Sequence, residues 1–170
     1  MGYVNISRLS QFIPPSDFVK VGTGTWTEKI SDFVLCQERA ALAADIQVYV
    51  PVSLMSSPIK TQGAKIFSLD LWFKIAVADV DMLAPACFKT TLDTNGSPVS
   101  AVVYEDVISD AAHSSPFTAG VIGDHKMSLT FTHPPYFLED TIYSFGFAIN
   151  GTNTAVITLF GAQVSYQLRI

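Results

Sequence analysis

The stretch IFSLDLWFKI, residues 66–75, has the clearest period-two pattern in the chain. Large apolar side chains occupy every second position from Phe67 to Ile75, and most positions between them are polar. Successive side chains of a β-strand point to opposite faces, so this pattern predicts a strand with one buried face. The intervening positions also include Ile66 and Trp72, which gives the outer face apolar groups. A second packing partner is therefore expected on that outer face.

The same alternation recurs along much of the chain. It is found in residues 46–52, 127–131, 143–149 and 164–170, and the apolar segment 156–160 is expected to form a further strand. An Asn-Gly step at 95–96 separates two further apolar runs and predicts a tight hairpin. No alternation of strands with helices is visible, which excludes a parallel α/β fold.

Residues 31–43 fit two descriptions. Ser31 and Asp32 are suited to cap a short helix, and the alanines at 40–44 favour one. Residues 33–36 fit a strand equally well. With this segment left open, we expect an all-β, antiparallel, jelly-roll-like β-sandwich of about eight strands with at most one short helix.

Residues 1–17 are expected to form an extended arm, and residues 18–170 a single domain. The Pro14-Pro15 pair ends any helix and keeps the backbone extended. The arm carries large apolar side chains, which are poor material for a disordered tail. Docking on a neighbouring subunit and packing on its own domain are equally open.

Composition favours assembly. Apolar residues make up 49% of the 170 residues and charged residues only 15%. Average domains carry about 25% charged residues, so part of this surface is expected to be covered by another subunit. The net charge of −5 and the scattered Lys and Arg argue against nucleic acid as a partner. The apolar runs are broken by Gly, Pro or charge, which argues against membrane insertion.

Two cysteines, Cys36 and Cys87, lie in apolar surroundings. Buried free thiols are the favoured interpretation, although a disulfide stays open. The first residues lack a charged segment followed by an apolar one, so no secretion signal is expected.

No pattern of catalytic residues stands out. His113, His125 and His133 lack the paired spacing of metal ligands and are expected in surface loops, so no metal or other cofactor is predicted. The adjacent acids at 105–106 and 139–140 would point to opposite sides of a strand. An enzyme is therefore not expected, and a cupin-like metal enzyme is only a third alternative.

Two groups of side chains are candidates for contacts with other molecules. Aromatic platforms for a glycan would be Tyr136, Trp72 and Tyr104, with the long 105–124 segment beside them. Candidates for a subunit interface are Ile6, Leu9, Phe12, Ile13, Ile66, Trp72, Tyr166 and Leu168.

The low charge, the apolar arm, the β-sandwich pattern and a chain end within a strand pattern together resemble small virion proteins of bacteriophages. The resemblance implies a structural virion protein, such as a capsid decoration, capsid or tail-fibre component, made in the host cytoplasm. It also implies assembly as a homotrimer with other virion proteins as partners. The alternative is a carbohydrate- or receptor-binding β-sandwich module that contacts a host-surface glycan.

Overall fold

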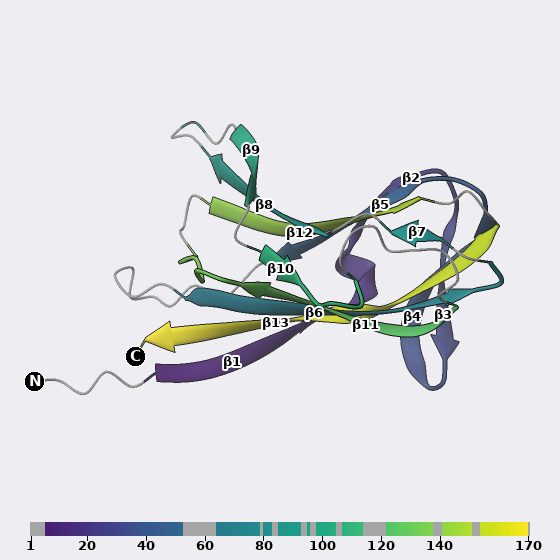
Figure 1. Ribbon diagram of the computed structural model, residues 1–170, viewed down its shortest axis with the longest axis horizontal. Coiled ribbons are helices and arrows are strands. Elements are labelled where there is room, and N and C mark those ends of the chain that lie inside the picture. The colour runs from purple at the N-terminus through teal and green to yellow at the C-terminus, as the bar shows by residue number, and fades with distance from the viewer. Residues whose placement is uncertain are drawn as a thin grey trace, which may run out of the picture.

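The computed structural model is a β-sandwich (Figure 1). It describes residues 6–52, 64–78, 80–82, 85–92, 95, 98–104, 107–113, 122–137, 141–150 and 154–169. Within these residues the strands form two antiparallel sheets, one of seven strands and one of six. The only helical segment in this part of the chain is a 3-10 turn, η1 (Pro15–Asp17), and no helix there could cross a membrane. The expectation of an all-β antiparallel sandwich is confirmed.

The seven-stranded sheet is built around the longest strand, β13. Its order is β10 (Val107–Ser109), β11 (Gly123–Phe131), β6 (Lys65–Ala76), β13 (Ala155–Arg169), β4 (Val34–Leu42) and β3 (Trp26–Ser31). The seventh strand, β1 (Ile6–Ile13), also pairs with β13. Much of the expected arm is therefore a strand of the chain's own sheet, in agreement with the alternative that the arm packs on its own domain.

The six-stranded sheet covers the inner face of the first sheet (Figure 1). Its order is β2 (Val19–Gly22), β5 (Ile46–Val52), β12 (Thr141–Asn150), β8 (Ala86–Leu92) and β9 (Pro98–Tyr104), with β7 (Asp81–Met82) beside β12. The antiparallel pairing of β8 with β9 confirms that the two apolar runs beside the Asn-Gly step pair with each other, while the tight turn itself lies mostly outside the described residues. Short strands such as β2, β7 and β10 raise the number of strands above the eight or so that were expected.

The core lies between the sheets and follows the predicted alternation. Buried side chains come from the inner positions of β5, β6, β11, β12 and β13. In β12, for example, Tyr143, Phe145 and Phe147 are buried. Both cysteines are free and buried, Cys36 in one sheet and Cys87 in the other, so the free-thiol interpretation is confirmed.

The predicted faces of β6 are wrong at its first residues. The register with β13 shifts between Ser68 and Ile66, so Phe67 is an extra residue in the ladder, a β-bulge. The bulge reverses the alternation. Ile66, expected outside, is fully buried, and Phe67, expected inside, is half-exposed.

β13 changes its neighbour halfway along. Its first part pairs with β4 as far as Leu159, and its second part pairs with β1 from Ala162. A bulge at Phe160 and a glycine with φ of +138°, Gly161, lie at the change. β1 occupies the place beside β13 that β4 has left, so the end of β4 is free to leave the sheet.

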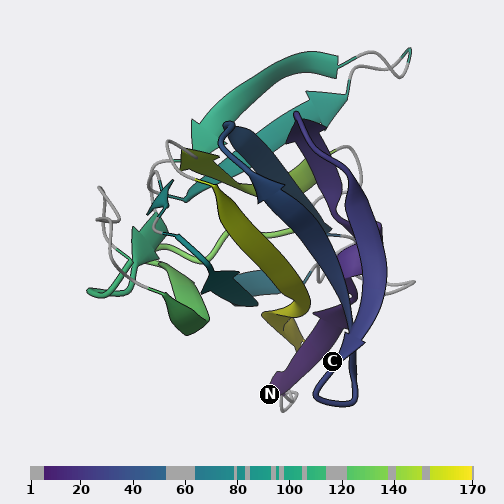
Figure 2. The ribbon, with the colours of Figure 1, turned by 90° about the vertical axis from the view of Figure 1, so that its right-hand side faces the viewer.

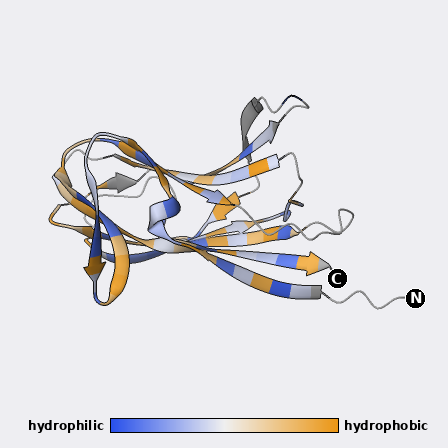
Figure 3. Cartoon of the chain, turned by 180° about the vertical axis from the view of Figure 1, so that it is seen from behind, coloured by the Kyte–Doolittle hydropathy of each residue, from blue (hydrophilic) through white to orange (hydrophobic). Residues whose placement is uncertain are grey.

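The freed end of β4 and the adjoining part of β3 form a projecting hairpin. Residues 31–43 are therefore strand and turn, which decides the open alternative against a helix. The hairpin projects on the side away from the six-stranded sheet (Figure 1), and Figures 2 and 3 show its length and the apolar residues at its tip. Its two turn residues, Asp32 and Phe33, have φ of 50° and 67°. Both values lie in the left-handed region, which is costly for residues other than glycine.

Candidate functional site

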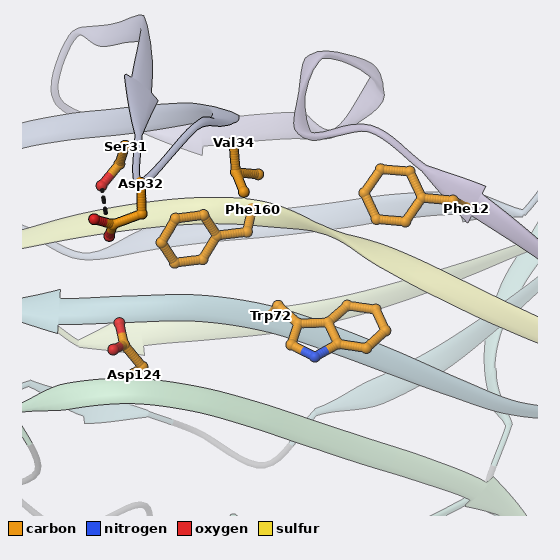
Figure 4. A pocket seen from close by; sticks show the side chains of 7 residues that line it. All are labelled: Phe12, Ser31, Asp32, Val34, Trp72, Asp124 and Phe160. Atoms are coloured by element: carbon orange, nitrogen blue, oxygen red, sulfur yellow. Dashed lines mark hydrogen bonds between the residues drawn. The ribbon is translucent and has the colours of Figure 1, made fainter.

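A groove opens on the outer face of the seven-stranded sheet, beside the projecting hairpin. Its volume is about 420 Å³, within the range of roughly 300–1,000 Å³ that is typical of ligand pockets. Its lining, which we call the aromatic groove, consists of Phe12, Ser31, Asp32, Val34, Trp72, Asp124 and Phe160 (Figure 4). Six strands and the hairpin turn thus contribute to one concave surface.

Three aromatic rings form the apolar part of the groove. Trp72 lies on β6, directly opposite Gly161 of β13, and Phe160 is the bulged residue just before that glycine. Phe12 lies over Gly161, because a Cβ atom added there would be 2.3 Å from its Cζ atom. Only glycine leaves room for this ring, so the change of partner along β13 creates the aromatic groove and also fixes one of its walls.

Two carboxylates lie at one end of the aromatic groove, opposite the end formed by Phe12 (Figure 4). Asp32 comes from the hairpin turn and accepts a hydrogen bond of 3.4 Å from the Ser31 hydroxyl. Asp124, at the start of β11, lies 3.6 Å from the Lys74 ammonium and is exposed. Both carboxylates keep oxygen lone pairs available to a ligand.

A polar network continues from the groove along the same sheet face. The Lys126 ammonium lies 5.6 Å from the centre of the Trp72 ring and 3.0 Å from an Asp70 oxygen. The Ser128 hydroxyl donates to the other Asp70 oxygen at 2.6 Å. The indole face of Trp72 is therefore bordered by fixed hydrogen-bonding groups.

The structure places the three predicted aromatic platforms apart. Trp72 lines the aromatic groove. Tyr136 is exposed and forms a bridge with Lys65, whose ammonium lies 4.6 Å from the tyrosine ring, and it takes no part in the groove. The Tyr104 side chain lies outside the described residues. Of the two candidate aromatic residues that can be placed, Trp72 alone lines the aromatic groove, and the role of these residues in glycan binding stays a prediction.

The predicted interface residues other than Trp72 fall into four groups. Phe12 and Leu9 are exposed on β1, and Phe12 lines the groove. Ile13, Ile66 and Tyr166 are buried within the chain, so they have little surface left for a neighbour. Leu168 packs against the core, and the Ile6 side chain is outside the described residues.

The sequence alone did not point to Phe160, Asp32 or Asp124. The sequence predicts only a strand at residues 156–160, and the bulge that turns Phe160 outward leaves no trace in the pattern of residue types. Asp32 and Asp124 are far apart in the sequence and meet through the sheet order. Glycine at 161, directly after an aromatic residue in a strand, was a usable signal for a bulge.

The histidines differ from the prediction of surface loops. His113 is buried, and its Nδ1 lies 2.6 Å from Asp110 Oδ1, while its Nε2 lies 3.5 Å from His125 Nδ1. The His125 ring stacks on Phe73 at 5.0 Å between ring centres. Only His133 is exposed as expected. In the described ranges, no group of three His, Cys, Asp or Glu is placed to hold a metal ion.

Asp110 is the anchor of this histidine pair. Partial burial acts to raise the pKa of its carboxyl group, but hydrogen bonds from the Ser128 N–H, the His113 ring and the Ala112 N–H outweigh it. The pKa of Asp110 is therefore below its ordinary value. The Ser128 N–H donates to Asp110 Oδ2 at 2.7 Å, which ties the 110–113 turn to β11. This cluster is best understood as a structural tie.

No protein-family model matches this chain, and no curated protein matches it in sequence. Among solved structures, the enzymatically active domain of tailspike protein 4 from bacteriophage CBA120 is similar over 90% of this chain, with 14% identity and a TM-score of 0.38. This chain spans only 19% of the length of that tailspike domain.

Two further structures are similar along nearly their whole length. TmCBM61, solved with β-1,4-galactotriose, shares 10% identity over 92% of this chain and 91% of its own, with a TM-score of 0.45. The xylan-binding module CBM15 shares 9% identity over 94% of this chain and 97% of its own, with a TM-score of 0.43. At these values the likenesses carry no argument about the ligand of this chain.

Proposed function

We propose that this protein is a glycan-binding β-sandwich and that the aromatic groove is its binding site. The observation that carries the proposal is the arrangement of Phe12, Trp72 and Phe160 around one cavity with Asp32 and Asp124 at its end. The virion role expected from the sequence is compatible with such a site, since a virion protein can contact host glycans.

The chemistry of the groove suits a sugar ring. The faces of aromatic rings carry partial negative charge, and they attract the weakly positive C–H groups on one face of a pyranose. The hydroxyl groups at the sugar's edge need hydrogen-bond partners when water is displaced. Asp32, Asp124 and the network around Lys126 supply acceptors and donors at the edge of the aromatic surface.

We propose binding without cleavage. A glycosidase uses two carboxyl groups, one of which is kept protonated by an apolar, buried environment. Asp32 and Asp124 are both exposed, and Asp124 is next to the Lys74 ammonium. Neither has the surroundings of a general acid.

The test is a glycan array followed by calorimetry with the best binder. Trp72→Ala should weaken binding about five-fold, because stacking on one aromatic ring is worth about 1 kcal/mol. Trp72→Phe, which keeps a ring, should lose less. Ile142→Ala is the matched control, since Ile142 is exposed at 46% on β12 of the other sheet.

The outcomes separate clearly. Retained affinity in a folded Trp72→Ala protein would place the glycan elsewhere and refute the proposed site. Absence of binding to any glycan would refute the proposed function. Release of reducing sugar from a bound glycan would refute binding without cleavage.

A second candidate function is self-assembly, and the projecting hairpin favours it. At its tip Ile30, Phe33 and Leu35 are exposed at 76%, 103% and 55%, and Ile30 pairs directly with Leu35, so both lie on one face of the hairpin. Such a patch is typical of an interface. We propose self-assembly on this basis, as the homotrimer that the resemblance to virion proteins implies, and sedimentation of the wild type and Ile30→Ser tests it. A stable monomer at high concentration would refute it.

A further inference from the structure

The outer sheet face carries a second groove, in line with the first. Its volume is about 370 Å³, and its lining consists of Arg8, Leu9, Ser10, Phe67, Ser68, Ser165 and Tyr166. The bulge in β6 supplies its aromatic member, because it turns Phe67 out of the core. We call this the basic groove, since Arg8 is the one charged residue in its lining.

Strand register places both grooves on the same face. In β1, Arg8, Ser10 and Phe12 are separated by two residues each, so their side chains share a face. In β6, Ser68, Asp70 and Trp72 are likewise separated by two residues each, so their side chains also share a face. The Arg8 guanidinium lies 5.6 Å from the centre of the Phe67 ring, which confirms that this ring is on the outer face.

The strip between the grooves is polar. Register aligns Phe12 with Gln163, and Gln163 with Asp70, across β1, β13 and β6. In the next outward-facing row, which already lines the basic groove, Ser10 faces Ser165, and Ser165 faces Ser68. These amide, carboxylate and hydroxyl groups can bond to the hydroxyls of sugar units that bridge two aromatic surfaces.

The separation of the grooves sets the length of the ligand. Trp72 and Phe67 are five residues apart on one strand, which corresponds to about 16 Å at roughly 3.3 Å per residue. This span fits about three linked sugar rings and is too long for a monosaccharide.

Charge sets the chemistry and direction of the ligand. The carboxylates Asp32 and Asp124 lie in the aromatic groove, whereas the basic groove has Arg8 alone. Lys74 and Lys126 are each beside an aspartate, but within the described residues no carboxylate is paired with Arg8. An anionic sugar would be repelled at one end of the strip and attracted at the other.

We propose that the ligand is a linear, acidic glycan of about three or more units, with an anionic unit on Arg8 and Phe67. This inference rests on the proposed function of the aromatic groove. A guanidinium held against a ring presents its donor fork to a carboxylate or sulfate group. The basic groove therefore selects for charge and length, while the aromatic groove supplies the first stacking contact.

The test is calorimetry of the full chain with neutral and uronic-acid-containing oligosaccharides from two to six units. Affinity for the acidic series should rise with length and level off once the strip is spanned. Arg8→Gln should lower affinity for the long acidic chains about five-fold and remove their preference over neutral ones. Arg8→Lys should restore only part of it, and Phe67→Ala should flatten the dependence on length.

Ser16→Ala, an exposed change outside both grooves, is the control and should leave all affinities unchanged. Trp72-dependent binding that is equal for short and long chains, or for neutral and acidic ones, overturns this inference and leaves the proposed function standing. No binding by any chain overturns both.

Discussion

Gly161→Ala is the substitution that most directly probes how the aromatic groove is built. The glycine has φ of +138°, in a region occupied almost only by glycine, and forcing an alanine there costs roughly 1–3 kcal/mol. The new Cβ would lie 2.3 Å from Phe12 Cζ and 3.1 Å from the Ile13 carbonyl oxygen. Overpacking of this kind costs a further 1–3 kcal/mol or so. We expect a total loss of about 3 kcal/mol.

The assay is equilibrium unfolding in urea. With a slope of about 2 kcal/mol per molar, the expected loss lowers the midpoint by about 1.5 M. A double-mutant cycle with Phe12→Ala separates the two causes, because removing the ring relieves the clash and leaves the backbone strain. Gly161→Ala should therefore cost about 1–2 kcal/mol less in the Phe12→Ala background.

Additive free energies, within about 0.5 kcal/mol, would refute the claim that Phe12 is held over Gly161. A Gly161→Ala protein as stable as the wild type would refute the strained geometry altogether. Glycan affinity provides the second readout, since a displaced Phe12 removes one wall of the aromatic groove.

Three further predictions follow from local geometry. Folding lowers the pKa of the Asp110 carboxyl group below its ordinary value of 3.8. The contribution of Asp110 to stability is therefore present above pH 3.8 and is lost as the pH falls through the folded pKa. Urea unfolding should show that Asp110→Asn destabilises the protein at pH 7 and matters less below pH 3.8, and a constant difference would contradict this. Phe33→Gly should raise the free energy of unfolding by up to about 1 kcal/mol, since it relieves a left-handed φ at a side chain that packs on nothing, and a lower melting temperature would contradict it. Burial raises the pKa of Cys87 to about 12, so iodoacetamide at pH 8 should leave it unmodified until urea unfolds the protein, and rapid alkylation of the native chain would contradict this.

The strands in which apolar and polar residues alternate were predictable from the sequence. Tyr143, Phe145 and Phe147 follow period two in a strand with neighbours on both sides, so pattern and burial agree. The pairing of β8 with β9 was predictable because an Asn-Gly step between two apolar runs favours a hairpin. The Asp32-Phe33 turn lacks that signature, and a short apolar segment beside alanines fits helix and strand equally.

Among the lining residues of the aromatic groove, the sequence singled out only Trp72 and, as an interface candidate, Phe12. The other lining residues could not be predicted, because their positions depend on bulges and on sheet order. A bulge shifts the side chains on one side of it to the opposite face, as Ile66 and Phe67 show, and the alternation of residue types does not mark where that occurs. His113 was misplaced for a related reason. Its burial depends on Asp110 and on β11, and the sequence does not reveal that neighbour.

The position of β13 also has a consequence for biosynthesis. This strand pairs with β6 on one side and with β4 and then β1 on the other. These three strands come earlier in the chain, and β13 is the strand that joins them into one sheet. All three leave the ribosome before residues 155–169 do, and they carry unpaired strand edges until then. Pairings between distant segments form slowly. The nascent chain therefore stays vulnerable to aggregation until residues 155–169 have been made and have paired with these earlier strands.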